Sequence, residues 1–183
     1  VNQKALEQYL SFQYSPLEET FFRGIYKLMP GHMLLYKNGN YEIKTYFKTK
    51  LAPGQWDRKT NMEQLRNQLA ENLKASVEHH MLSDVEVGAF LSGGVDSGYL
   101  ASSSGADQAF TVGFDEGDRY SEVNKAAKVA EKAGLKHHVK IISKQEFWDA
   151  LPDVMYHMDE PLADASAVAL YFLSKEAAGH VKV

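Results

Sequence analysis

Hydrophobic spacing over most of the chain switches repeatedly between the helical and the strand pattern. Leucines and a valine at every fourth position predict an amphipathic helix over residues 61–81. Four short apolar runs follow, with helical spacing between them. The predicted strands are 85–91, 109–114, 137–142 and a start at 180–183, and the predicted helices are 97–104, 122–133, 145–158 and 166–178. Strands that alternate with helices indicate an α/β fold, a parallel sheet with right-handed crossovers and helices on both faces.

The beginning of the chain has a different pattern. A short helical stretch over 2–12 is followed by β-rich sequence, in which Asn38-Gly39 lies between two strand-like runs. Both residues tolerate positive φ, so they predict a hairpin. Residues 48–60 are polar and contain Pro53-Gly54, which is typical of a linker. We therefore predict a β-rich unit over 1–47 and an α/β unit over 61–183.

Local signals refine the helix ends. Ser143 with Glu146, and Thr60 with Glu63, each predict a capping box at a helix N-terminus. Ser121 is the expected cap of the helix that follows it. Gly134 stands where a left-handed residue would end that helix.

Composition excludes several function classes. The formal net charge is −4 and no dense Lys/Arg cluster occurs, which argues against a nucleic-acid groove. The longest apolar run, 167–173, is far too short to span a membrane. The absence of cysteine excludes disulfides, thiolate metal sites and a cysteine nucleophile within these residues, and it fits the cytoplasm. Because the chain starts at valine and ends inside an apolar pattern, we expect a fragment of a longer protein.

The stretch FLSGGVDSGYL, residues 90–100, carries the most specific chemistry. It follows the first predicted strand of the parallel sheet, at the edge where such sheets bind ligands. Gly93 and Gly94 let the backbone turn sharply and approach a phosphate, while the next helix directs free N–H groups at the loop. Ser92 and Ser97 add hydroxyl groups. Asp96 would repel a phosphate unless Mg²⁺ lay between them, so the loop predicts a pocket for a metal-bound polyphosphate.

The loop has no lysine of the Walker type. SGGVDS instead resembles the PP-loop of ATP pyrophosphatase-type enzymes. Read with the other segments in order, the chain is similar to the glutamine-dependent asparagine synthetases of the asparagine synthetase B type. LEQYLSFQYSP, TFFRGIYKLMPGH and TYF resemble the end of that family's glutaminase domain. HHMLSDVEVGAFLSGGVDS, FTVGF, SEVNKAAKVAEKAG and YHMDEP resemble the first part of its synthetase domain.

The resemblance implies a fold and a reaction. The C-terminal part would be a PP-loop, Rossmann-like domain, and residues 1–47 the β-rich end of an Ntn-type glutaminase domain. The parent protein would be a ligase that adenylates the side-chain carboxylate of aspartate with ATP and Mg²⁺ and then amidates it with ammonia from glutamine. Asparagine, AMP and pyrophosphate would result.

The resemblance also assigns site residues. Pyrophosphate would be held by Ser92, Gly93, Gly94 and Ser97. Asp96 would bind Mg²⁺. The nucleoside would contact Phe90, Leu91, Val112 and Gly113.

Other parts of the family pattern are missing from these residues. The family's glutaminase nucleophile is an N-terminal cysteine, and its second acidic glycine-rich motif lies on the strand that 180–183 would begin. We therefore expect the final catalytic residues beyond the C-terminus, and no activity from the fragment alone. The expected partners are the small molecules aspartate, glutamine and ATP, with neither nucleic acid nor membrane, and a homodimer stays open.

Alternative interpretations keep the loop and change the rest. A β-lactam synthetase or another PP-loop enzyme that adenylates a carboxylate would use a different acceptor, and a non-catalytic nucleotide-binding relic would have no acceptor. The segment MDEPLADAS, residues 158–166, has two interpretations. It either faces the substrate, or it is only a capped helix start, in which Pro161 and Asp164 mark the boundary. The adjacent pairs His79-His80 and His137-His138 lack the H-E-x-x-H spacing, so we expect solvated or core histidines there.

Overall fold

A computed structural model describes residues 1–50, 61–115, 122–161 and 163–183. The backbone divides into two compact units. Unit 1 consists of 1–58 and 155–164, and unit 2 of 59–154 and 165–183. Most of the predicted linker, 51–60, lies outside the described residues, so the predicted domain bounds stay a prediction.

Unit 1 contains a helix and a hairpin. Helix α1 (Gln3–Phe12) begins at Asn2, whose side chain accepts a hydrogen bond from the Lys4 amide. Strands β1 (His32–Lys37) and β2 (Asn40–Thr45) pair antiparallel. They are joined by Asn38 and Gly39 at φ 52° and 81°, the left-handed conformation that a two-residue hairpin turn requires. The hairpin prediction is confirmed.

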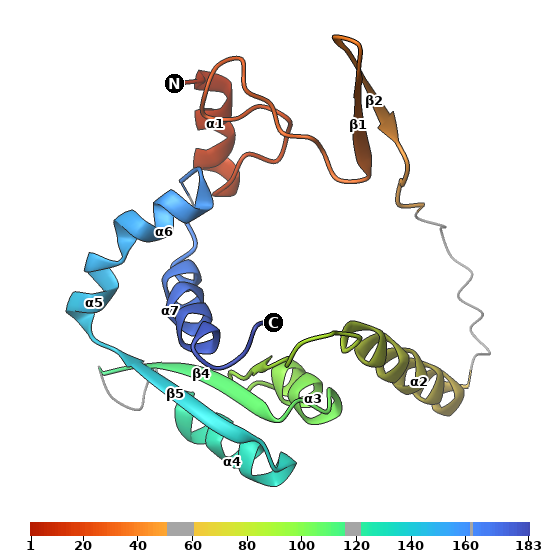
Figure 1. Cartoon of the computed structure of the whole chain (residues 1–183), viewed down its shortest axis with the longest axis vertical. Coiled ribbons are helices and arrows are strands. Elements are labelled where there is room, and N and C mark those ends of the chain that lie inside the picture. Colours follow the sequence, from red (N-terminus) through yellow and green to blue (C-terminus); the bar gives the residue numbers. More distant parts are fainter. Residues whose placement is uncertain (51–60, 116–121, 162) are drawn as a thin grey trace. The chain divides into compact units, whose positions relative to one another are not determined.

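Unit 2 is a parallel sheet in the order β3-β4-β5 with helices on both faces (Figure 1). Helix α2 (Met62–His80) precedes strand β3 (Ala89–Phe90), helix α3 (Val95–Ser103), strand β4 (Gln108–Phe114), helix α4 (Val123–Ala133) and strand β5 (Lys136–Ile142). Helices α5 (Lys144–Asp149), α6 (Leu151–Met158) and α7 (Ser166–Ala178) complete the described elements. The α/β fold class is confirmed.

Strand alternation assigns the side chains to two faces of this sheet. Phe90, Phe110 and His138 share one register row, and Phe110 packs on Ala177 and Val181 at the end of α7. The residues next to them point to the opposite face. There a core cluster joins β3 and β4 to α3 and α4; its members are Leu91, Ala101, Ala109, Ala126 and Ala130.

Two predicted elements differ from the structure. The strand expected over 85–91 is ladder-paired only at Ala89–Phe90. The helix expected over 145–158 is broken between α5 and α6, at Ala150. Pro152 explains the break, because proline has no N–H to donate and its ring crowds the carbonyl four residues earlier.

The last residues lie beside β3 without being assigned as a strand. The Gly88 amide donates to the Val183 carbonyl at 2.7 Å, and the Val183 amide donates to the Glu86 carbonyl at 3.4 Å. These two bonds give a parallel pairing on the side of β3 that faces away from β4. The start of a strand expected at 180–183 therefore shows the backbone pairing of a strand, although no strand is assigned there.

Capping predictions had mixed outcomes. Ser143 and Glu146 form the predicted capping box, and Gly134 is left-handed at φ 71°. The N-cap of α2 is Asn61, so the prediction for Thr60, which lies outside the described residues, was wrong. Ser121 also lies outside them, and the N-cap of α4 is Glu122. None of the helices in the described ranges combines the length and apolar character needed to cross a membrane.

Candidate functional site

The hydroxyl groups of the loop between β3 and α3 form hydrogen bonds that join its two ends. The Ser97 Oγ accepts a hydrogen bond from the Ser92 amide at 3.2 Å and lies 2.9 Å from the Ser92 Oγ. The Ser92 Oγ also accepts from the Gly94 amide at 3.4 Å. The two serines that bracket the loop are therefore adjacent, as expected for a pair that presents hydroxyls to one ligand.

Gly93 is fixed by the helix on the next crossover. Its φ is 78°, and a Cβ atom there would lie 2.8 Å from the Ala126 amide nitrogen and 2.8 Å from the Lys125 Cβ. Both contacts are closer than real Cβ atoms allow. The first turn of α4 thus packs directly against the loop backbone, and only glycine fits.

A side chain at Gly94 would not clash with the fold. Its φ and ψ, −73° and 164°, suit any residue, and a Cβ would lie 3.4 Å from the Ser92 Oγ and 3.9 Å from the Ser97 Oγ. Gly94 is also the N-cap of α3, with no side chain bonded to the first turn. The missing Cβ lets a ligand approach this backbone closely, next to the two hydroxyls and the first turn of α3, where the helix N–H groups and the positive end of the dipole are directed. This arrangement suits an anion.

Asp96 is exposed in the first turn of α3. Among the described residues its carboxylate has no hydrogen-bond or ionic partner. One carboxylate beside an anion cradle is a fitting donor set for Mg²⁺, which is commonly held by one or two carboxylates, waters and phosphate oxygens.

A link between the loop and the sheet was missed by sequence reasoning. The buried Thr111 Oγ1 donates to the Leu91 carbonyl at 2.6 Å and lies 2.7 Å from the His137 Nε2. Since the threonine proton goes to the carbonyl, the imidazole N–H donates to Thr111. Burial lowers the pKa of His137, which keeps the ring in this neutral donor form. Leu91 directly precedes Ser92, so three strands hold the start of the loop. The only sequence signal was a threonine and a histidine on adjacent buried strands.

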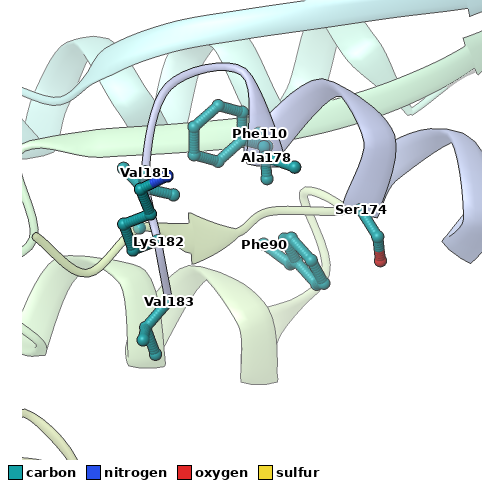
Figure 2. A pocket seen from close by; sticks show the side chains of 9 residues that line it. Phe90, Phe110, Ser174, Ala178, Val181, Lys182 and Val183 are labelled. Carbon is teal, nitrogen blue, oxygen red and sulfur yellow. The ribbon is translucent and has the colours of Figure 1, made fainter.

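The four expected nucleoside residues divide between the two sheet faces. Leu91 is 2% exposed inside the α3–α4 core, so only its backbone is available to a ligand. Gly113 is buried on the same face, and Phe90 and Val112 are on the α7 face. Figure 2 shows Phe90 and Phe110 beside Val181 and Val183, around a cavity of about 420 Å³ that does not include Val112 or the loop.

A second hollow of about 410 Å³ lies at the carboxyl ends of β4 and β5. It is lined by Phe114, Asp115, Ile142, Ser143, Lys144, Phe147 and Trp148. Ser143, the N-cap of α5, is one of these lining residues, and it forms the capping box with Glu146. Hydrogen bonds from Lys140 and from the Ser143 backbone and side chain hold the pKa of Glu146 down at about 2.

The MDEPLADAS segment is described except for residue 162. Glu160 forms an ion pair with Lys27 within unit 1. The N-cap of α7 is Ala165, with no side-chain hydrogen bond to the helix, so the interpretation of this segment as a capped helix start was wrong. Its alternative, contact with substrate, stays a prediction.

Comparison with known proteins finds two families along the chain. The family described as asparagine synthase matches residues 68–183, and the glutamine amidotransferase domain matches residues 1–47. Asparagine synthetase [glutamine-hydrolyzing] 1 of Bacillus subtilis is 38% identical over 100% of this chain and 29% of its own length. A putative asparagine synthetase [glutamine-hydrolyzing] of Mycobacterium tuberculosis H37Rv is 35% identical with the same coverage.

A solved structure is more distant. An NH3-dependent NAD synthetase from Campylobacter jejuni is 17% identical, with a TM-score of 0.36 over 65% of this chain and 53% of that chain. That likeness is too loose to support an argument.

These matches place the chain in a class of two-part proteins, with a glutamine amidotransferase domain and an asparagine synthase domain. The chain belongs to the asparagine synthase family. The resemblance drawn from its motifs is confirmed. The chain spans about 29% of the length of the curated relatives it matches.

Proposed function

We propose that this chain is the ATP-binding part of a glutamine-hydrolysing asparagine synthetase. The observation that carries the proposal is the loop of residues 92–97. There Gly93 admits no side chain, Gly94 exposes its backbone beside two hydroxyls, and the N-cap of α3 makes no side-chain hydrogen bond to the helix. A loop of this kind suits pyrophosphate, because its N–H groups stabilise the negative charge that pyrophosphate gains as it leaves ATP.

The proposed roles follow from position. Ser92, Ser97 and the amides of the glycine pair hold pyrophosphate as it leaves. Asp96 holds Mg²⁺, which supplies charge neutralisation at the phosphates. Phe90, Val112 and the backbones of Leu91 and Gly113 contact the nucleoside.

The reaction balances in two steps. The aspartate side-chain carboxylate bonds to the α-phosphorus of ATP while the bond to pyrophosphate breaks. Ammonia, released together with glutamate when water hydrolyses glutamine, then attacks the acyl carbon and loses a proton as the amide bond forms, and AMP leaves with the electron pair of the broken acyl–phosphate bond. Aspartate, glutamine and ATP are the proposed small-molecule partners, and the cytoplasm is the proposed location.

The test follows α-labelled ATP in the intact protein, with Mg²⁺, aspartate and glutamine. AMP that appears only with aspartate supports the proposal. AMP that requires another carboxylate keeps the loop assignment and replaces the substrate. ADP as the product, or no turnover, would contradict the assignment of the loop to pyrophosphate.

Asp96→Ala tests the metal role in the same assay. Turnover that depends on Mg²⁺ is expected to disappear, while the thermal midpoint stays close to that of the wild type because Asp96 is exposed. The matched control is Asp107→Ala, which removes an exposed aspartate before β4, where the loop is not involved. Full turnover in Asp96→Ala would remove the assignment.

A further inference from the structure

Three side chains that commonly ligate metals converge on the α7 face of the sheet, outside the loop. His138 comes from β5, Glu176 from α7, and His180 follows the end of that helix. One potential ligand atom of each lies within 4.8 Å of those of the other two. The sequence pattern did not indicate this site, because His138 is far along the chain from the Glu176–His180 pair.

The cluster contains more than an ordinary surface ion pair, because a third side chain from another element joins it. The His180 Nε2 lies 3.5 Å from the Glu176 Oε1, a pair that the end of any helix could form at this spacing. His138 is on a different element, yet its ring centroid is 3.9 Å from that of His180, at 36° between the planes. A pair of imidazoles beside one carboxylate offers two nitrogen ligands and one oxygen ligand to a single ion.

A chain of hydrogen bonds fixes the tautomer of His138. The Gln108 amide nitrogen donates to the Glu86 carboxylate at 2.6 Å, so the amide oxygen faces the other way. That oxygen lies 2.9 Å from the His138 Nε2 and accepts its proton. The lone pair is then on Nδ1. Metal-binding histidines are typically oriented in this manner by a partner on the other ring nitrogen.

Phe110 gives the cluster a rigid floor. Its ring is fully buried and stacks on His138 at a centroid distance of 5.0 Å and 16° between the planes. The Glu176 and His180 side chains are 34% and 35% exposed, so an ion can enter from solvent. The cluster thus packs on Phe110 and remains accessible to solvent.

We propose that His138, Glu176 and His180 bind one Zn²⁺ ion, with water completing a tetrahedral site. Two histidines and a carboxylate are a recurrent zinc ligand set, whereas Mg²⁺ prefers oxygen ligands alone. The ion would tie the C-terminal end of α7 to β5. No residue of the phosphate loop takes part, so this site and the proposed nucleotide site stand or fall separately.

The experiment titrates ZnCl₂ into the intact, untagged protein by calorimetry, without nucleotide and with excess Mg²⁺ to occupy oxygen-only sites. One Zn²⁺ per chain is expected, together with a rise in thermal midpoint, since an ion that binds only the folded state stabilises it. Co²⁺ in place of Zn²⁺ should give the visible absorption of a four-coordinate ion.

His180→Gln and Glu176→Gln are each expected to weaken zinc binding at least about tenfold, since even partners outside the ligand shell change affinity by roughly that factor. Both side chains are partly exposed, so the variants should keep the wild-type midpoint without zinc. His79→Gln is the matched control, because His79 belongs to the other described histidine pair and bonds only to the Ala75 carbonyl of its own helix. No zinc binding by the wild type, or equal binding by all four proteins, would overturn the proposal.

Discussion

Gly93 and Gly94 are neighbours in sequence, yet a Cβ atom would meet different surroundings at each. Gly93 combines a left-handed φ with direct contact to the backbone of α4. Gly94 has an ordinary conformation, and a Cβ atom there would only come into ordinary van der Waals contact with the Ser92 and Ser97 hydroxyls. The fold therefore requires the first glycine but not the second, for which we propose a role in ligand binding.

Alanine at each position separates the two requirements. Gly93→Ala is expected to lower the free energy of unfolding by at least about 2 kcal/mol, because a left-handed Cβ alone costs about 1–2 kcal/mol and the clash with Ala126 adds to it. Gly94→Ala should leave stability within about 1 kcal/mol of the wild type. It should nevertheless weaken ATP binding at least about tenfold, a loss of about 1.4 kcal/mol, because the methyl group would stand where we propose that a phosphate approaches the backbone.

Urea denaturation and equilibrium ATP binding on the two variants check these expectations. Equal destabilisation by both substitutions would contradict the structural distinction. Unchanged ATP binding in Gly94→Ala would show that no phosphate approaches this backbone.

At the scale of single elements, the capping box of α5 makes stability depend on pH. The Glu146 carboxylate accepts hydrogen bonds from Lys140 at 2.6 Å and from the Ser143 amide at 2.8 Å, and these hold its pKa near 2 instead of 4.5. A lowered carboxylate pKa in the folded state stabilises the protein above the unfolded value. That contribution is fully present above about pH 4.5 and is lost as pH falls toward about 2.

Glu146→Gln should therefore be less stable than the wild type at neutral pH, and the difference should shrink below pH 4.5. Thermal midpoints of both proteins across the acid range measure this. Glu131→Gln is the control, since Glu131 is an exposed glutamate on α4 whose carboxylate has no partner among the described residues. A constant difference at every pH would contradict the role of the ionised carboxylate.

The same scale shows which elements the sequence could predict. The Asn38-Gly39 hairpin and α7 over 166–178 were predicted closely, because their turn chemistry and spacing are local. The short extent of β3 was not predicted, since it depends on which neighbours pair with the strand. The helix predicted over 145–158 contains Pro152, but only the structure showed that it separates into two helices near that residue.

The candidate sites follow the same division. The loop residues Ser92 to Ser97 are contiguous, so their chemistry was visible in the sequence. The link from His137 through Thr111 to Leu91 crosses three strands, and the trio that includes His138 joins a strand to a helix end. Contacts of this kind depend on sheet order and register, which spacing along the chain does not record.

At the scale of the whole molecule, the two units differ in how they are packed. Unit 2 has buried clusters on both faces of its sheet. Both strands of the unit 1 hairpin are largely exposed, including Leu34, Tyr36 and Ile43. A two-stranded hairpin is marginally stable by itself. We therefore expect unit 2 to be the more resistant part.

Limited proteolysis tests both this order and the proposed linker over 48–60. Trypsin has targets there at Lys48, Lys50, Arg58 and Lys59. The first cut is expected among them, and the larger lasting product should begin near residue 60, because exposed polar connections between packed units are the preferred sites of nicking. Mass spectrometry of the products over time identifies the cuts. A first cut at Lys74 in α2 or Lys128 in α4 would instead mean that unit 2 opens before the connection is reached, against both the boundary and the order of stability.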